Sequence, residues 1–153
     1  PKYEEIKLNK KSLLKKLLQN YSLECKSLLC KSEVTENLEK LRDISIKMPW
    51  LIVSGGDQNE LREVFKHKKI YSFFNGGIFG SPDKKNEIVQ REITNRNIKL
   101  PALMFGDSKL DYAVAKSNEI DFIFVTQWTE LNDYKSYCIE NSINYLNSVS
   151  EII

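Results

Sequence analysis

The pattern of hydrophobic positions changes near residue 48. Before it, apolar residues recur at helical spacing over 10–29 and again over 32–46. After it, short continuous apolar runs alternate with further helical patterns. Such runs are typical of strands buried on both faces of a parallel sheet. The pattern therefore predicts two helices followed by an α/β domain, in which helices cover both faces of a parallel sheet.

The first predicted helix is amphipathic and basic. Lysines occupy one side, and the other side is apolar: Leu13, Leu14, Leu17, Leu18, Tyr21, Leu28 and Leu29. Such a helix can lie on a membrane surface, but more often it packs on its own domain with its charges in water. The second helix takes Ser32 as its cap and Val34, Leu38 and Leu41 as its inner face.

Four apolar runs are predicted as strands: 50–53, 70–74, 102–105 and 121–125. Asp57, after the first run, is placed to cap a helix. Ser81 and Pro82 resemble the cap and first position of another helix, which puts Lys84 and Lys85 in its first turn. Ser108 is placed to cap a third helix, whose inner face includes Leu110 and Val114.

Composition describes an ordinary globular domain. The 153 residues are 41% hydrophobic and 29% charged, and 23 basic against 21 acidic residues give a net charge of +2. This balance does not favour a nucleic acid as partner, and no apolar stretch reaches the length of a membrane span. The three cysteines have no metal-binding or disulfide spacing, which favours a reducing compartment such as the cytoplasm. The single histidine, His67, is predicted at the surface near a helix end.

Polar residues follow three of the predicted strands. Ser54 and Gly55 can direct a hydroxyl and backbone N–H groups at an anion, or they form a plain loop. A lysine near the start of a helix is unfavourable, because the helix dipole is positive there. Lys84 and Lys85 are explained if an anion binds at this helix start; otherwise they are solvated surface residues. Asp107 and Asp111 offer hard oxygen ligands for Mg²⁺, although Asp111 also fits a capping box with Ser108.

Taken in order, these segments resemble the second, third and fourth motifs of the haloacid dehalogenase (HAD) superfamily, in its phosphatase branch (phosphoglycolate phosphatase-like). The segments are Ser54-Gly55-Gly56, Gly80-Ser81-Pro82-Asp83-Lys84-Lys85 and Gly106-Asp107-Ser108-Lys109-Leu110-Asp111. The resemblance covers about residues 48–126. It implies a Rossmann-like parallel sheet at 32–153, and it implies that 1–31 is the tail of a helical cap.

The resemblance also implies roles for individual residues. Ser54 and Gly55 would bind the phosphate, Lys85 rather than Lys84 would stabilise its charge, and Asp107 and Asp111 would hold Mg²⁺. The implied activity is hydrolysis of a small phosphorylated metabolite through an aspartyl-phosphate. The alternative is a non-catalytic HAD-like binding or regulatory domain.

The family's first motif, an Asp-x-Asp that carries the nucleophile, does not occur in this sequence. We expect that motif to precede Pro1, where a separate chain could also supply it, and we expect the chain alone to be inactive. In the family its strand lies between the strands that end at Ser54 and Asp107. Three outcomes are expected for the vacant place: a strand from outside this sequence fills it, the two flanking strands pair directly, or the N-terminal segment enters it. The first is favoured.

Overall fold

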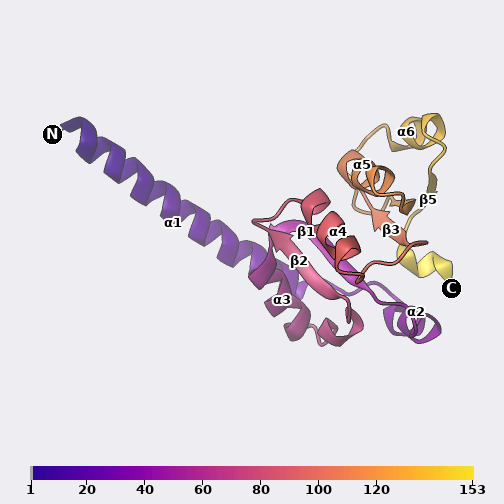
Figure 1. Cartoon of the computed structure of the whole chain (residues 1–153). Coiled ribbons are helices and arrows are strands. Elements are labelled where there is room, and N and C mark those ends of the chain that lie inside the picture. The colour runs from indigo at the N-terminus through magenta and orange to yellow at the C-terminus, as the bar shows by residue number, and fades with distance from the viewer. Residues whose placement is uncertain (1) are drawn as a thin grey trace. The chain divides into compact units, whose positions relative to one another are not determined.

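The computed structural model describes residues 2–153, with side chains from Lys10 onward. The chain divides into two compact units, 1–33 and 34–153 (Figure 1). In the first unit, helix α1 (Lys2–Lys31) contains the predicted helix and extends it at both ends. Within the described residues, no helix is long and apolar enough to cross a membrane.

The second unit alternates strands and helices, as the apolar runs predict. Its strands are β1 (Leu51–Asp57), β2 (Gly77–Ser81), β3 (Leu103–Gly106), β4 (Asp121–Val125) and β5 (Asn144–Leu146). Its α-helices are α2 (Leu38–Ile44), α3 (Gln58–His67), α4 (Lys85–Thr94), α5 (Lys109–Ser117) and α6 (Tyr134–Glu140). Short 3₁₀ helices, η1 (Tyr71–Phe73) and η2 (Val149–Ile152), complete it. The predicted α/β class with parallel strands flanked by helices is confirmed.

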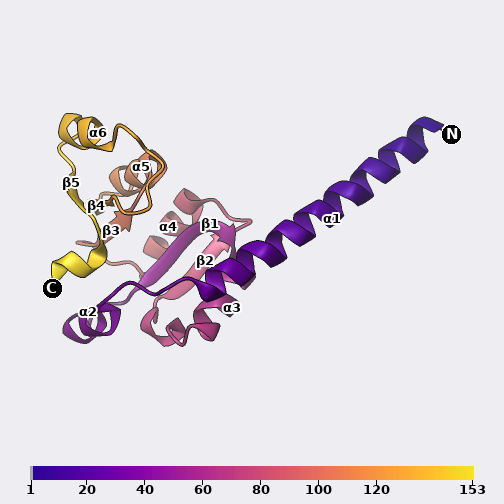
Figure 2. The ribbon, with the colours of Figure 1, turned by 180° about the vertical axis from the view of Figure 1, so that it is seen from behind.

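The strands form two separate parallel sheets. β1 pairs with β2, with Leu51 opposite Gly77 and Val53 opposite Phe79. The second sheet has the order β3-β4-β5, with Leu103 opposite Asp121. Figure 2 shows β1 beside β2, with β3 and β4 as a separate group. β1 and β3 are not paired with each other, so the direct pairing of these two strands, one of the three expected outcomes, does not occur.

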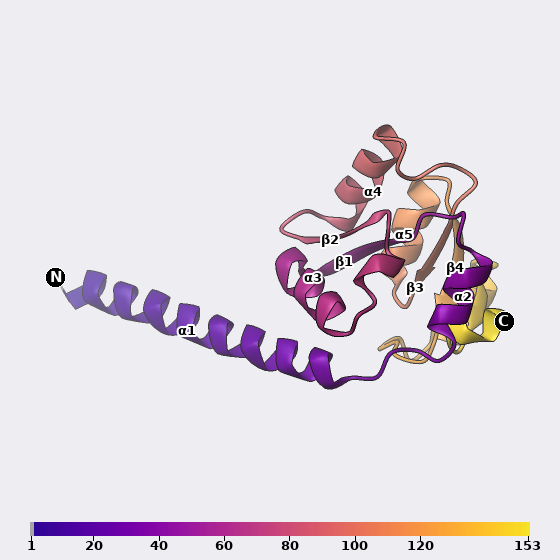
Figure 3. The same ribbon diagram turned by 90° about the horizontal axis from the view of Figure 1, so that it is seen from below.

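One layer of helices connects the two sheets. α4 and α5 lie on the same side of the strands, and α3 lies on the other side (Figure 3). Val89 of α4 and Ala115 of α5 belong to one buried cluster, against which both Val53 of β1 and Met104 of β3 pack. A second cluster, around Phe124 and Cys138, lies between β4 and α6. The first of these clusters is therefore shared by the two sheets.

Two predictions about the early part of the second unit are wrong. The helix predicted over 32–46 is only α2, because Asn37 takes a left-handed conformation (φ 57°) directly before it. The strand predicted over 70–74 is the 3₁₀ helix η1. There the ring of Phe74 packs against Phe65 and Trp50, at centroid distances of 5.1 and 5.8 Å, so its apolar residues serve an aromatic cluster instead of a sheet.

Two further boundaries differ from prediction. The helix predicted to start at Ser81–Pro82 starts at Lys85, and the backbone N–H of Lys84 donates to the Glu87 carboxylate at 3.3 Å. β1 continues through Ser54 to Asp57 instead of ending before Ser54. Asp57 does cap α3, as predicted, by accepting from two backbone N–H groups at 2.9 and 3.0 Å.

On the faces of helices, Val114 is buried as predicted, but Leu110, predicted on the inner face of α5, is 60% exposed. Leu110 lies in the first turn, beyond the end of the strands that the rest of the helix covers. His67 is exposed and is the last residue of α3, as predicted.

Candidate functional site

The predicted site residues lie where strands end. Ser54 is the middle residue of β1, Lys85 begins the helix after β2, and Asp107 and Asp111 follow β3. Lys85 Nζ lies 2.6 Å from Asp111 Oδ1. Because this contact joins the starts of α4 and α5, the carboxyl ends of both sheets lie at the same edge. Ligands of open α/β sheets bind at this edge.

Lys85, Asp111 and Ser108 form a hydrogen-bonded group. The Ser108 hydroxyl donates to Asp111 Oδ2 at 2.6 Å, and it also caps α5 by accepting from the Asp111 backbone N–H at 3.2 Å. The side chain of Asp111 is only 4% exposed and that of Lys85 20%. Both carboxylate oxygens of Asp111 are therefore engaged by protein donors, one of them charged. The capping role considered for Ser108 is confirmed, with Asp111 as its partner.

The neighbouring lysine is placed quite differently. The side chain of Lys84 is 84% exposed, and its ammonium lies 3.9 Å from Glu87 on the surface. An exposed pair at this distance contributes little, about 0–1 kcal/mol. Of the two lysines, Lys85 pairs with the buried Asp111, and Lys84 lies on the surface beside Glu87.

Gly106 has no side chain, and this lets Asp111 approach the end of β3 closely. A Cβ at this position would lie 2.4 Å from Asp111 Cβ and 2.8 Å from its Cγ. Real Cβ atoms do not approach so closely, and the side chain of Asp111 is held on both sides. The glycine in Gly-Asp-Ser thus allows the first turn of α5 to close over the end of β3.

An arginine holds the segment that precedes Lys85. Arg91 Nη1 donates to Asp83 Oδ2 at 2.6 Å, and its Nε donates to Glu92 Oε1 at 3.0 Å. These two hydrogen bonds raise the pKa of Arg91. Its guanidinium also lies over the ring of Phe79 in β2, 5.5 Å from the centroid. Arg91 thereby connects the loop after β2 to α4. The sequence analysis did not identify this contact, because an Asp and an Arg eight residues apart form no recognisable motif.

Asp107 borders a cavity of about 350 Å³ at the sheet edge. Its side chain is exposed, and within the described part of the chain its carboxylate has no hydrogen bond or ion pair. Its carbonyl accepts from the Thr129 hydroxyl at 2.6 Å. The loop that carries Thr129 also brings Trp128, which is 78% exposed, and Glu130 to the cavity wall. The sequence contained no signal for this loop beyond its position after a strand.

Ser54 and Gly55 are less closely tied to this group. The Ser54 hydroxyl accepts from the Gly56 N–H at 3.1 Å, and Gly55 has open space where a Cβ would be. Across the described residues, neither makes a hydrogen bond or ion pair with Lys85 or the two aspartates. The structure therefore brings together Lys85, Ser108 and Asp111. Asp107 is next to Ser108 in the chain, and Ser54 lies in β1, a strand of the other sheet.

The donors at this edge suit Mg²⁺ only in part. Asp107 offers an unengaged carboxylate, and hard oxygen donors are the ligands that Mg²⁺ prefers. Both carboxylate oxygens of Asp111 already accept a hydrogen bond, one from Lys85 and one from Ser108, so Asp111 fits a supporting position better than a direct ligand position. In the part of the chain with described side chains, no three acidic, histidine or cysteine residues converge on one point. A complete magnesium site would need another oxygen ligand from elsewhere.

Comparison with known families identifies the class of protein. Residues 2–125 match the family model of haloacid dehalogenase-like hydrolases. The chain therefore belongs to this family, as its motifs indicate. No curated protein matches the chain by sequence.

Solved structures agree with this fold. The chain is similar to a haloacid dehalogenase-like family hydrolase from Streptococcus pneumoniae, with a TM-score of 0.65, 21% identity, and 81% of this chain and 60% of that one covered. A protein from Clostridium difficile, classed provisionally as a phosphatase, has a TM-score of 0.64 and 21% identity, with 80% of this chain and 60% of that one covered. A HAD-superfamily hydrolase from Ehrlichia chaffeensis has a TM-score of 0.59 and 22% identity, with 92% of this chain and 69% of that one covered. The chain thus spans about 60% of the length of the first two.

Proposed function

We propose that this chain provides most of the site of a Mg²⁺-dependent phosphomonoester hydrolase that acts through an aspartyl-phosphate. Its substrate would be a small phosphorylated metabolite, and the phosphoglycolate phosphatase-like branch is the best match to its motifs. The nucleophile would come from a segment outside these 153 residues. Residues 1–31 would be the tail of a cap and 32–153 the core. Its three cysteines are not joined in disulfide bonds, and this supports a cytoplasmic location.

The observation that carries this proposal is the arrangement of charge at the sheet edge. Lys85 and Asp111 neutralise each other at 2.6 Å, and the exposed carboxylate of Asp107 beside them leaves the group with one negative charge. A net negative group with hard oxygen donors attracts a divalent cation. With that cation the group becomes positive, as a phosphate-binding site requires.

Each residue then has a defined task. Asp107 would hold the metal, and Asp111 would fix the ammonium of Lys85 toward the phosphate. Ser54 and Gly55 would donate a hydroxyl and a backbone N–H to the phosphate oxygens. Mg²⁺, when bound, would supply charge neutralisation on the transferring group. Phosphoryl transfer needs little beyond such positioning and charge stabilisation.

A non-catalytic HAD-like binding or regulatory domain is the second candidate. It is favoured by the absence of an Asp-x-Asp from the sequence and by the complete pairing of Lys85 with Asp111. A domain of this kind would bind a phosphorylated ligand at the same edge without cleaving it. The two candidates thus share a binding site and differ in the reaction.

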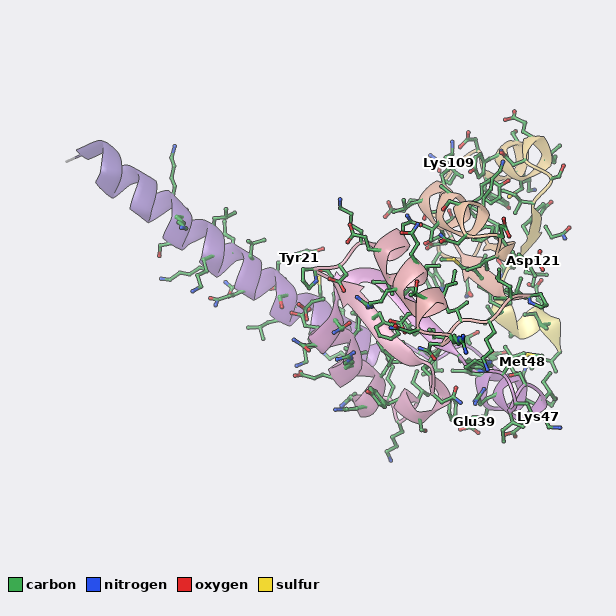
Figure 4. The ribbon with its side chains drawn as sticks, viewed as in Figure 1. Tyr21, Glu39, Lys47, Met48, Lys109 and Asp121 are labelled. Atoms are coloured by element: carbon green, nitrogen blue, oxygen red, sulfur yellow. The ribbon has the colours of Figure 1, made fainter. Side chains whose placement is uncertain are left out.

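Binding of inorganic phosphate with and without Mg²⁺, followed by ³¹P NMR, tests the shared site. We expect the phosphate resonance to broaden only when protein and Mg²⁺ are both present. Asp107→Asn should abolish this broadening, because it removes the metal-binding charge. The matched control is Asp121→Asn. Asp121 is also exposed but begins β4 opposite Leu103, whereas Asp107 follows the other end of β3. Figure 4 shows Asp121 away from Lys109, which begins α5. Equal binding by both variants would contradict the proposal.

A further inference from the structure

The cavity beside Asp107 has one wall that the proposed phosphate site does not use. Apart from Asp107 and the two residues that follow it, the cavity is bordered by Trp128, Glu130 and Leu131. Its volume of about 350 Å³ falls within the usual range of ligand pockets, about 300–1,000 Å³. An ester whose phosphate binds at Asp107 therefore has room for its organic part beside these three loop residues.

The loop that forms this wall is fastened to Asp107. The Thr129 hydroxyl donates to the Asp107 carbonyl at 2.6 Å and accepts from the Leu131 backbone N–H at 3.1 Å. Trp128 and Glu130 flank Thr129 in the chain, and both border the cavity. The hydroxyl of Thr129 thus holds the part of the loop that carries them next to the proposed metal ligand.

Trp128 presents a free aromatic face at this wall. With 78% of its surface exposed, it is the most exposed large hydrophobic side chain among those that the structure describes. Within the described side chains, no other ring and no cation lies against it. By contrast, the ring of Trp50 packs 5.8 Å from that of Phe74, and the Arg42 guanidinium lies 5.2 Å from its centroid. The face of Trp128 is therefore available to a ligand.

The same wall carries a negative charge without a partner. The side chain of Glu130 is exposed, and its carboxylate makes no hydrogen bond or ion pair with the residues that the structure describes. Lys109 also borders the cavity, but its ammonium lies 4.8 Å from the centroid of the Tyr137 ring and 3.9 Å from Asp133. Neither of these two partners lines the cavity. The charge of Lys109 is thus directed toward α6, and it does not neutralise Glu130.

We propose that Trp128 and Glu130 form a subsite for a cationic group, so that the substrate is the phosphate monoester of an amino alcohol. This inference rests on the proposed function, because it names the organic part of the ester bound at Asp107. Tryptophan is the aromatic side chain that attracts an ammonium group most strongly, and quaternary ammonium ligands are bound in this way. A carboxylate beside it attracts the same charge. A neutral ring stacked on Trp128 leaves Glu130 without a role, whereas a cation accounts for both residues.

Binding of two phosphate esters of the same shape, followed by ³¹P NMR titration, tests this subsite. The probes are phosphocholine and its carbon isostere, in which a quaternary carbon replaces the positive nitrogen. With Mg²⁺ present, we expect the wild-type chain to bind phosphocholine about tenfold more tightly than the isostere, because only the charged group gains from the tryptophan face and the carboxylate. Inorganic phosphate is titrated in parallel as the probe of the phosphate site itself.

Variants assign this preference to individual residues. Trp128→Leu and Glu130→Gln should each lower the ratio of the two affinities to less than about threefold, and Trp128→Phe should retain part of it because phenylalanine keeps an aromatic face. Since Trp128 and Glu130 are exposed, these changes leave the core intact. The matched control is Glu140→Gln, which should keep the full ratio. Glu140 is also exposed, but it is the last residue of α6 and does not border the cavity.

The outcomes separate this inference from the proposed function. If inorganic phosphate binds with Mg²⁺ but the two esters bind equally, the cationic subsite is overturned and the phosphate site stands. The subsite is also overturned if either variant, Trp128→Leu or Glu130→Gln, keeps the full wild-type ratio. If neither inorganic phosphate nor either ester binds in the presence of Mg²⁺, the proposed function fails, and this inference fails with it.

Discussion

Removing Lys85 should destabilise the protein far more than removing its neighbour. Lys85→Ala leaves the carboxylate of Asp111, only 4% exposed, with the Ser108 hydroxyl as its remaining hydrogen-bond donor. Breaking a buried ion pair in this way costs about 3–5 kcal/mol. Because Lys85 is 20% exposed and water reaches it, we expect the lower end, about 3 kcal/mol.

Urea denaturation followed by tryptophan fluorescence measures this cost. With an m-value of about 2 kcal/mol/M, the midpoint should fall by about 1.5 M. The control Lys84→Ala should change the free energy of unfolding by less than about 0.5 kcal/mol, since that side chain is 84% exposed. Equal midpoints for the two variants would refute the buried pair.

The double variant Lys85→Ala/Asp111→Asn separates pairing from simple loss of packing. Asparagine keeps the shape of the aspartate and removes the charge that Lys85→Ala would strand. We expect the double variant to be more stable than the sum of the single changes by about 1–2 kcal/mol, within the range of contacting pairs. Additive losses would mean that the two side chains act independently, contrary to their 2.6 Å contact.

Three further predictions concern other positions. Gly106→Ala should lower the free energy of unfolding by about 1–3 kcal/mol in urea titrations because its Cβ meets Asp111, whereas Gly55→Ala, in open space, should stay near wild type; similar losses would contradict the close approach. Burial raises the pKa of the Cys138 thiol, so iodoacetamide should modify it much more slowly in the folded than in the unfolded chain. Since the unfolded thiol loses its proton first, near pH 8.5, the unfolding free energy should fall above that pH, and less so in Cys138→Ala. Chelation of Mg²⁺ should abolish phosphate binding in the wild-type chain as completely as Asp107→Asn does, and binding that survives EDTA would exclude the metal.

Local chemistry made part of this structure predictable from sequence. Asp57 and Ser108 cap their helices as expected, because a cap depends on residues within one turn. The run 121–125 is β4 with the same bounds, since its apolar residues lie between clear breaks. The order of strand ends followed from these elements and put the candidate residues at one edge.

Other features depend on contacts that the sequence pattern does not carry. The sequence pattern predicts Phe74 in a strand, but its ring packs in an aromatic cluster with Phe65 and Trp50. The start of α4 is set by Glu87 rather than by Ser81. Thr129, which fixes the Asp107 carbonyl, lies on a loop with no regular pattern. In each case a tertiary contact overrides the local signal.

The most direct test of the central claim is the turnover of a phosphate monoester, such as p-nitrophenyl phosphate, with and without an added strand peptide that ends in Asp-x-Asp. The chain alone has no such motif and should release no phosphate. With the peptide bound, we expect Mg²⁺-dependent turnover that Asp107→Asn abolishes and Asp121→Asn retains. Turnover by the chain alone that Asp107→Asn abolishes would contradict the account, as would a peptide that binds the chain without producing any turnover.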